Sequence, residues 1–117
     1  MNVEASLIEW LNANTDFEWF GNVPLDRPEV FGTVERTGGG ISDVVVDSPT
    51  VALQVWAPTR SAASEKAYEV ARAIPGYARA KDVRSVSVNS IYNFPDLQGD
   101  LARYQLVLDI TTVQRAQ

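Results

Sequence analysis

The longest alternating stretch of the sequence, residues 102–113, most constrains what this chain can fold into. One set of alternate residues in it is apolar and the other is largely polar. The apolar set is Tyr104, Leu106, Leu108 and Ile110, and the intervening set is Gln105, Val107, Asp109 and Thr111. A period of two places these sets on opposite faces of a β-strand, so we expect a sheet with one face buried.

The rest of the chain supplies partners for this strand. Further strands are predicted over residues 17–20, 30–37, 51–56 and 83–92, and residues 41–46 are expected to resume extended structure. Two amphipathic helices are predicted from apolar residues at helical spacing. The first has Val3, Leu7, Ile8 and Leu11 on one face, and the second has Ala63, Ala67, Val70, Ala71 and Ile74 and ends sharply at Pro75-Gly76. The order predicts an α+β fold in one domain over 1–117, a mostly antiparallel sheet of four or five strands with both helices packed on one face.

Turn residues separate these elements. Gly38, Gly39 and Gly40 cost much conformational entropy to order, so we place them at a mobile hairpin tip. A phosphate-binding loop would need a following Lys-Ser or Lys-Thr and a helix, whereas Ile41-Ser42-Asp43 leads into β-branched residues. Asp47-Ser48-Pro49 is interpreted as a second turn.

Composition argues against catalysis. The chain has no cysteine and no histidine, which excludes disulfides, thiol nucleophiles, Cys/His zinc sites and Ser-His-Asp arrangements. Two carboxylate pairs, Asp43 with Asp47 and Asp96 with Asp100, could hold Mg²⁺ or act as acid and base, but turn capping is the simpler interpretation. We therefore expect a protein that is not an enzyme and has no catalytic, cofactor-binding or metal-binding residues.

Charge limits the partners. Fifteen acidic and ten basic residues give a net charge of −5, and phosphate binding needs clustered Lys and Arg. The basic residues are spread singly, apart from a loose group at Arg79, Lys81 and Arg84. Specific nucleic-acid and membrane binding are not expected. The opening residues show neither a signal peptide nor a long apolar stretch, which predicts a cytoplasmic protein.

The sheet face away from the helices is the predicted contact surface. It would present Ala52, Gln54, Trp56, Gln105 and Val107, with Ser85 and Ser87 as further candidates, a half-apolar set that suits another subunit better than water. Trp56 is either an exposed interface anchor or simply buried. The arginines Arg27, Arg36, Arg60 and Arg103 are either solvated or paired with a neighbouring subunit. The candidate interface residues are Gln54, Trp56, Arg36, Gly38, Gly39, Gly40, Arg60 and Arg103.

Several segments in order resemble a known family. They are "VPLDRPEVFGTVERTGGG", a strand that ends in "VWA" before an Ala-rich helix, and a last strand that begins "ARYQ". The succession, carried by Pro24, Arg27 and Pro28, by 36–40, by 55–57 and by 102–105, resembles the small tail-terminator proteins of long-tailed bacteriophages and prophages, especially those of actinobacteria.

The resemblance implies a structural role. Such terminators form a ring, usually of six subunits, that caps the tail tube, stops its growth and presents a surface for joining the head. It implies as partners further copies of the chain, the major tail-tube protein and head or neck connectors, with DNA passing through the channel without specific binding. It also implies a late protein that is first in the host cytoplasm and then in the virion tail. The alternatives are a head-completion or neck connector protein, and a small non-catalytic ligand-binding domain.

Overall fold

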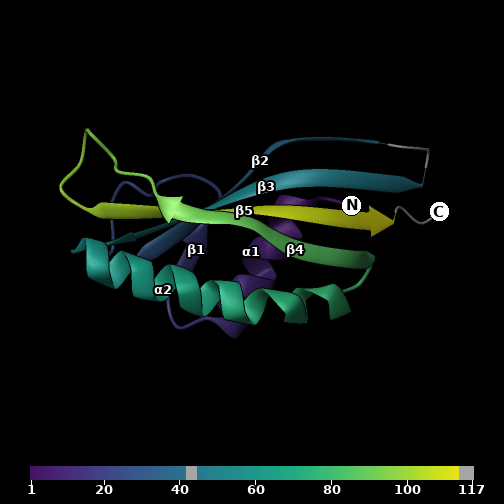
Figure 1. Cartoon of the computed structure of the whole chain (residues 1–117), viewed down its shortest axis with the longest axis horizontal. Coiled ribbons are helices and arrows are strands. Elements are labelled where there is room, and N and C mark those ends of the chain that lie inside the picture. Colours follow the sequence, from purple (N-terminus) through teal and green to yellow (C-terminus); the bar gives the residue numbers. More distant parts are fainter. Residues whose placement is uncertain (42–44, 114–117) are drawn as a thin grey trace.

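The computed structural model describes residues 1–41 and 45–113 (Figure 1). In chain order its elements are α1 (Val3–Asn14), β1 (Glu18–Phe20), β2 (Phe31–Ile41), β3 (Val46–Ala57), α2 (Arg60–Ala73), the 3-10 helix η1 (Ile74–Arg79), β4 (Val83–Asn93) and β5 (Ala102–Val113). The α+β class predicted from the sequence is confirmed.

The strands form one five-stranded sheet in the order β1-β2-β3-β5-β4. The pairs β2–β3, β3–β5 and β4–β5 are antiparallel, and the short β1 runs parallel to β2. The prediction of a mostly antiparallel sheet is therefore correct. β5, the strand with the clearest alternation, lies between β3 and β4, so the last segment of the chain completes the sheet by inserting between two earlier strands.

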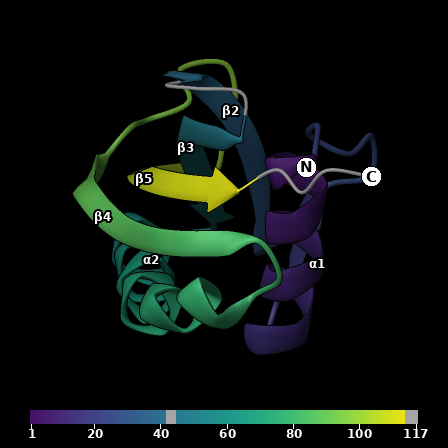
Figure 2. The same ribbon diagram turned by 90° about the vertical axis from the view of Figure 1, so that its right-hand side faces the viewer.

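Both helices pack into one hydrophobic cluster with the sheet. Leu7 and Leu11 of α1, Val70 of α2, and Leu53 and Leu106 of the sheet are fully buried in it. The cluster takes alternate residues of β3, since Val51, Leu53 and Val55 belong to it. In the end-on view of Figure 2, α1 lies beside β2 and α2 lies below β4. The other face of the sheet carries no helix in the described part of the chain.

Polar side chains fix both ends of α1. The Asn2 side chain accepts a hydrogen bond from the Ala5 N–H at 3.1 Å, which satisfies one of the free donors of the first turn. At the other end, the Thr15 hydroxyl donates to the Leu11 carbonyl at 2.6 Å and accepts from the Trp19 indole N–H at 2.8 Å. Thr15 therefore couples the end of α1 to the buried Trp19 of β1.

The second helix ends just before Pro75-Gly76, as predicted, but the chain continues from it into a 3-10 helix. Thr59 caps its start by accepting from the Ala62 N–H at 3.1 Å. Pro75 and Gly76 do not end the helical path; they lie inside η1, which continues directly from Ala73. The physical reason is that proline is tolerated in the first turn of a helix, where its missing N–H has no partner to lose.

The prediction of a mobile tip at Gly38–Gly40 is wrong. These residues belong to β2, where Gly38, Gly39 and Gly40 pair with Thr50, Pro49 and Ser48 of β3. Gly39 has φ = +85°, and a Cβ there would lie 2.0 Å from the Ser48 carbonyl oxygen. Only glycine combines this left-handed backbone with so close an approach of the partner strand. The glycines thus allow an irregular strand pairing rather than a loop.

The turn predicted at Asp47-Ser48-Pro49 is also wrong, because all three residues lie within β3. Pairing of β3 with β5 is interrupted here, since Asp47 faces Thr112 and the next pair is Thr50 with Asp109. A proline has no N–H to donate, and such an interruption is where a strand tolerates one. The expected extended segment over 41–46 includes residues 42–44, which lie outside the described residues.

Candidate interaction surfaces

Three cross-strand rows form the middle of the open face of the sheet. They are Thr33, Gln54, Gln105 and Tyr92; Glu35, Ala52, Val107 and Ser90; and Thr50, Asp109 and Ser87. None of these residues is a lysine or an arginine, and the two charged ones are acids. The middle of the face is thus polar, weakly acidic and largely made of short side chains, and the row of Phe31, Trp56 and Arg103 continues the face at one end.

Hydrogen bonds order the first of these rows. The Gln54 amide donates to the Gln105 side-chain oxygen at 2.8 Å, and the Gln105 amide donates to the Tyr92 hydroxyl. In the third row, the Asn89 amide donates to Asp109 at 3.0 Å. The predicted interface residue Gln54 therefore lies on the open face, within a side-chain network that spans β3, β5 and β4.

Trp56 is not the exposed anchor that one interpretation of the sequence offered. Its relative exposure is 1%. The Phe31 ring stacks on it at 4.7 Å and 7°, and the Arg103 guanidinium lies 5.5 Å from its ring centroid. Alternation along β3 predicts the correct face for Trp56, but Phe31 and Arg103 bury it there. It therefore supports the sheet end rather than contacting a partner directly.

Arg103 holds the β4–β5 loop, residues 94–101, over this end of the sheet. Its guanidinium lies 4.5 Å from the Phe94 ring centroid and donates to the Phe94 and Pro95 carbonyls at 2.7 and 3.3 Å. Within the loop, the Gln98 N–H donates to Asp96 at 3.1 Å. That bond is the main cause that lowers the pKa of Asp96, and the nearby charges of Arg103 and Arg27 and the Trp56 indole lower it further. The buried Trp56 N–H is near Asp96 but is not placed to donate a hydrogen bond. Asp96 is a turn-capping residue, as predicted.

Arg36 has its partner within the chain. Its guanidinium binds both carboxylate oxygens of Asp47, at 2.7 and 2.8 Å, and its backbone N–H donates to Glu4 of α1 at 3.0 Å. The hydrogen bonds to Arg36 lower the pKa of Asp47, and the same bonds raise that of Arg36. This pair explains why Asp47 is buried in a strand. The proposed partner Asp43 lies outside the described residues, so that carboxylate pair is not described.

The structure does not gather the remaining predicted residues at one site. Arg60 is the exposed first residue of α2, and no ion pair to it is found in residues 1–41 and 45–113. Gly38 and Gly40 are exposed near the opposite end of β3 from Trp56. The predicted set therefore divides among the open face, the glycine end of the sheet and the start of α2.

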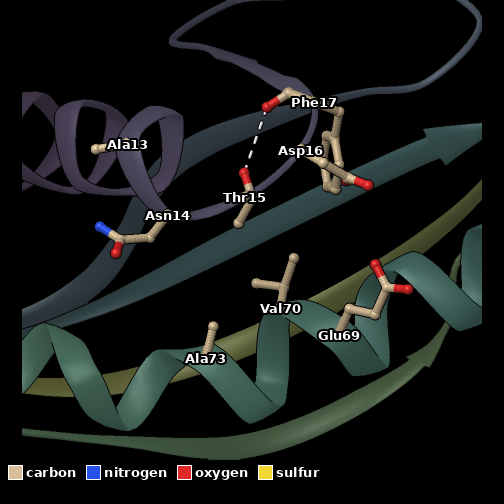
Figure 3. Close-up of a pocket in the computed structure, with 8 residues that line it drawn as sticks. All are labelled: Ala13, Asn14, Thr15, Asp16, Phe17, Glu69, Val70 and Ala73. Carbon is tan, nitrogen blue, oxygen red and sulfur yellow. Dashed lines mark hydrogen bonds between the residues drawn. The ribbon is translucent and has the colours of Figure 1, made fainter.

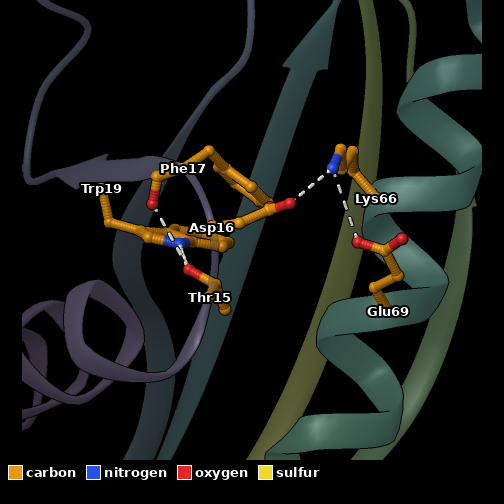
Figure 4. Close-up of polar contacts among 6 residues, drawn as sticks. All are labelled: Thr15, Asp16, Phe17, Trp19, Lys66 and Glu69. Carbon is orange, nitrogen blue, oxygen red and sulfur yellow. Dashed lines mark hydrogen bonds and ion pairs between the residues drawn. The ribbon is translucent and has the colours of Figure 1, made fainter.

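A cavity of about 520 Å³ lies between the end of α1 and α2 (Figure 3). Ala13, Phe17, Val70 and Ala73 give it apolar walls. Lys66 bridges its two sides, since its ammonium group lies 2.9 Å from Asp16 and 3.6 Å from Glu69 (Figure 4). The hydrogen bond with Asp16 raises the pKa of Lys66. The lysine is thus held as a cation that ties α2 to the segment between α1 and β1.

Two leucines that the sequence interpretation passed over are the most exposed large apolar residues in the described chain. Leu25 in the β1–β2 connection has a relative exposure of 104%, and Leu97 in the β4–β5 loop has one of 94%. The Arg27–Asp96 ion pair, at 3.6 Å, joins their two loops. A lone leucine between prolines was the only sequence signal, and nothing in the sequence shows that the two loops meet.

Neither a metal site nor a membrane-spanning helix is found among the described residues. Residues 1–41 and 45–113 contain no group of three or more acidic side chains placed to hold a metal ion. Within the same ranges, the helices are too short and too polar to cross a membrane. No family model and no curated protein matches the sequence.

Proposed function

We propose that this chain is a non-catalytic structural protein of a phage virion, a tail terminator that forms a ring of six subunits on the end of the tail tube. In this role it stops tube growth and joins the tail to the head or neck connectors. It acts first in the host cytoplasm and then in the virion tail. The proposal extends the resemblance carried by 24–28, 36–40, 55–57 and 102–105.

The observation that most supports this role is the chemistry of the open sheet face. Its three rows hold Glu35 and Asp109 but no lysine or arginine. At the end of the sheet, the guanidinium of Arg103 is occupied by carbonyl oxygens and aromatic rings. Cations on a surface bind phosphates and release counterions, so a face whose middle rows hold no cation, and whose Arg103 is bound to its own loop, favours the passage of a polyanion without sticking. Such a face suits the lining of a DNA channel.

The net charge of the chain also favours a role at a DNA channel. Each chain carries −5, so a ring of six would carry about −30. Repulsion spread around a channel keeps DNA centred and mobile, whereas a single basic patch would retain it. We therefore assign the open face to the channel, in place of the subunit contact predicted there from the sequence, and other surfaces of the subunit to contacts with its neighbours.

The alternatives remain distinguishable. A neck connector would share the ring and the channel but bind the portal side, so binding to purified heads rather than tails identifies it. A ligand-binding domain is favoured by one feature, the cavity between α1 and α2. Against it, the space between the helices and the sheet is filled by fully buried Leu7, Leu53 and Leu106.

The first test is solution mass by light scattering over a wide concentration range, with electron micrographs of the same sample. A closed ring near six subunits supports the proposal, and so does a monomer that binds purified tails and stops their growth. A tight dimer that does not change with concentration would overturn it.

The channel assignment has its own test in assembled particles. Asp109→Lys should slow DNA ejection, because it places a cation on the open face. Glu65→Lys, on the exposed surface of α2, makes the same charge change and should leave ejection unaltered. Equal behaviour of the two variants would remove the open face from the channel.

A further inference from the structure

Leu25 and Leu97 lie on two loops that an ion pair joins. Each is almost fully exposed, yet the Arg27–Asp96 ion pair brings their loops together at one place. Leu97 is adjacent to Asp96 in sequence, and Leu25 is two residues from Arg27. Single exposed leucines are common on protein surfaces, but two fully exposed ones on loops that are bonded to each other indicate a contact site. We call residues 21–30 and 94–101 together the leucine end.

The leucine end is held in place before any partner arrives. Arg103 donates to the Phe94 and Pro95 carbonyls and lies over the Phe94 ring, and Asp96 accepts from the Gln98 N–H. A loop that is already ordered loses little conformational entropy on binding, so more of the apolar contact energy remains as affinity. Leu97 therefore projects from a loop fixed on both of its sides.

The charge around these leucines is acidic. Asp26, Glu29 and Asp100 are exposed, and none of them has an ion-pair partner within residues 1–41 and 45–113. The two arginines of this region are both engaged, Arg27 with Asp96 and Arg103 with the loop carbonyls. A partner for the leucine end should therefore offer an apolar recess with cations at its edge.

The chain has such a recess beside α1. A cavity of about 310 Å³ lies between α1 and the turn that follows η1, and we call it the α1 groove. Its lining is Ser6, Glu9, Trp10, Ala13, Asn14, Ala80 and Lys81. Trp10 gives it an aromatic wall, fixed by edge contact with the Tyr77 ring at 5.7 Å. The groove is thus apolar at Trp10, Ala13 and Ala80.

Lys81 lines this groove, and Arg79 and Arg84 are its close neighbours in the sequence. Arg79, Lys81 and Arg84 form the most basic stretch of the sequence, and all three are exposed. Asp82 in the turn and Glu9 on α1 are the acids nearby. None of the three cations has an ion pair to another part of residues 1–41 and 45–113. In a chain of net charge −5, a basic edge beside an apolar groove complements the acidic leucine end.

The two features lie at separate places on the molecule. In Figure 1 the β4–β5 loop is at the left end, whereas α1 is near the middle and the turn from η1 into β4 is to its right. Two different, complementary patches on one subunit produce head-to-tail association, which closes into a ring when the rotation between copies allows it.

We propose that the leucine end of one copy docks in the α1 groove of the next copy, with Leu25 and Leu97 against Trp10 and Ala13 and the acidic loops facing Lys81. This inference rests on the ring-forming function proposed above and names the contact that would build the ring. It leaves the open sheet face free to line the channel.

Cysteine cross-linking tests the contact directly, because the chain has no cysteine of its own. A mixture of Leu97→Cys and Ala13→Cys chains, treated with a short bismaleimide, should give covalent dimers that neither variant gives alone. A chain that carries both substitutions should give a ladder that stops at the ring size. Leu97→Cys mixed with Ser87→Cys, an exposed position on the open face, is the matched control and should not cross-link.

A charge exchange provides a second, independent measurement. Lys81→Glu should weaken association at least tenfold in light scattering at low salt, and Asp26→Lys in the same chain should restore part of it. Arg72→Glu makes an equal charge change on the exposed side of α2 and should have less effect. Equal weakening by both substitutions would mean that net charge alone acts, and would overturn the docking.

The outcomes separate this inference from the proposed function. A ring in light scattering without the Leu97–Ala13 cross-link overturns the docking and leaves the terminator function standing. The cross-link in open chains of unlimited length supports the docking and contradicts the ring. A monomer that never cross-links, in solution or on purified tails, overturns the docking.

Discussion

On β3, neighbouring residues meet different surroundings on the two faces of the sheet. Leu53 points to the helices and is fully buried among Leu7, Val70 and Leu106. Gln54, the next residue, lies on the open face and donates to Gln105. One face has an aliphatic core that stabilises the fold, and the other has a network of polar side chains whose hydrogen bonds water can replace. We infer from this difference that residues of the helix face contribute most of the stability of the fold, and that residues of the open face can serve function.

The largest expected effect comes from shortening a residue of the helix face. Leu53→Ala should lower the free energy of unfolding by about 2–5 kcal/mol, because it removes buried apolar contacts and leaves a cavity. Gln54→Ala, its neighbour on the open face, should cost about 0.5–1.5 kcal/mol, because water replaces the lost hydrogen bond. Urea denaturation of both variants measures the two changes in the free energy of unfolding. Equal costs would contradict the division between the faces.

A smaller effect is expected at the glycine end of the sheet, which extends past both helices in Figure 1. Gly39→Ala should cost about 1–3 kcal/mol, because an L-residue at φ = +85° is strained and its Cβ meets the Ser48 carbonyl. Gly38→Ala and Gly40→Ala have open space at the Cβ and should stay within about 1 kcal/mol of the parent. Thermal unfolding of the three variants checks the order, and a neutral Gly39→Ala would restore the loop interpretation.

After Leu53→Ala and Gly39→Ala, the smallest of the three main effects is expected at the Arg36–Asp47 pair, which lies at the same end. Asp47→Asn should cost about 1–2 kcal/mol at neutral pH, because Asp47 is nearly buried but Arg36 is still one-third exposed and screened by water. The folded state lowers the pKa of Asp47, so this stabilisation is present above the unfolded pKa of about 3.9 and is lost as pH falls through the folded pKa. Parent and variant should therefore converge on acidification.

Denaturation from neutral pH to below pH 4 measures that convergence, and the double variant Arg36→Gln/Asp47→Asn closes a thermodynamic cycle. If Asp47→Asn costs as much in the Arg36→Gln chain as in the parent, the pair has no coupling. A difference between parent and Asp47→Asn that is constant with pH would assign the effect to packing instead of charge.

The two turn predictions that are wrong share one cause. The local preferences of glycine, aspartate and proline favour turns at Gly38–Gly40 and Asp47–Pro49. Each segment is instead opposite the other in the sheet, where Gly39 fits against Ser48 and Arg36 offsets the charge of Asp47. Local preference is weak beside a strand partner that satisfies the backbone and the charge together.

Trp56 and the leucine end show the same limit in the candidate site. The alternation in β3 assigns Trp56 to the face away from the helices, and no local pattern predicts that Phe31, Arg103 and the β4–β5 loop cover it. Likewise, the ion pair that joins the loops of Leu25 and Leu97 links residues far apart in sequence. Such contacts depend on how connections fold back over the sheet end.

By itself, the sequence determined the α+β class, both helices, the strand that ends the chain and the absence of Cys and His chemistry. Backbone geometry imposes periods of 3.6 and 2 on any chain, so buried faces leave a local record in the residues. The tertiary structure alone decided which outward side chains are covered, which glycines pair with the next strand, and which leucine-bearing loops are joined. Those outcomes depend on distant segments brought together by the fold, and no local period records them.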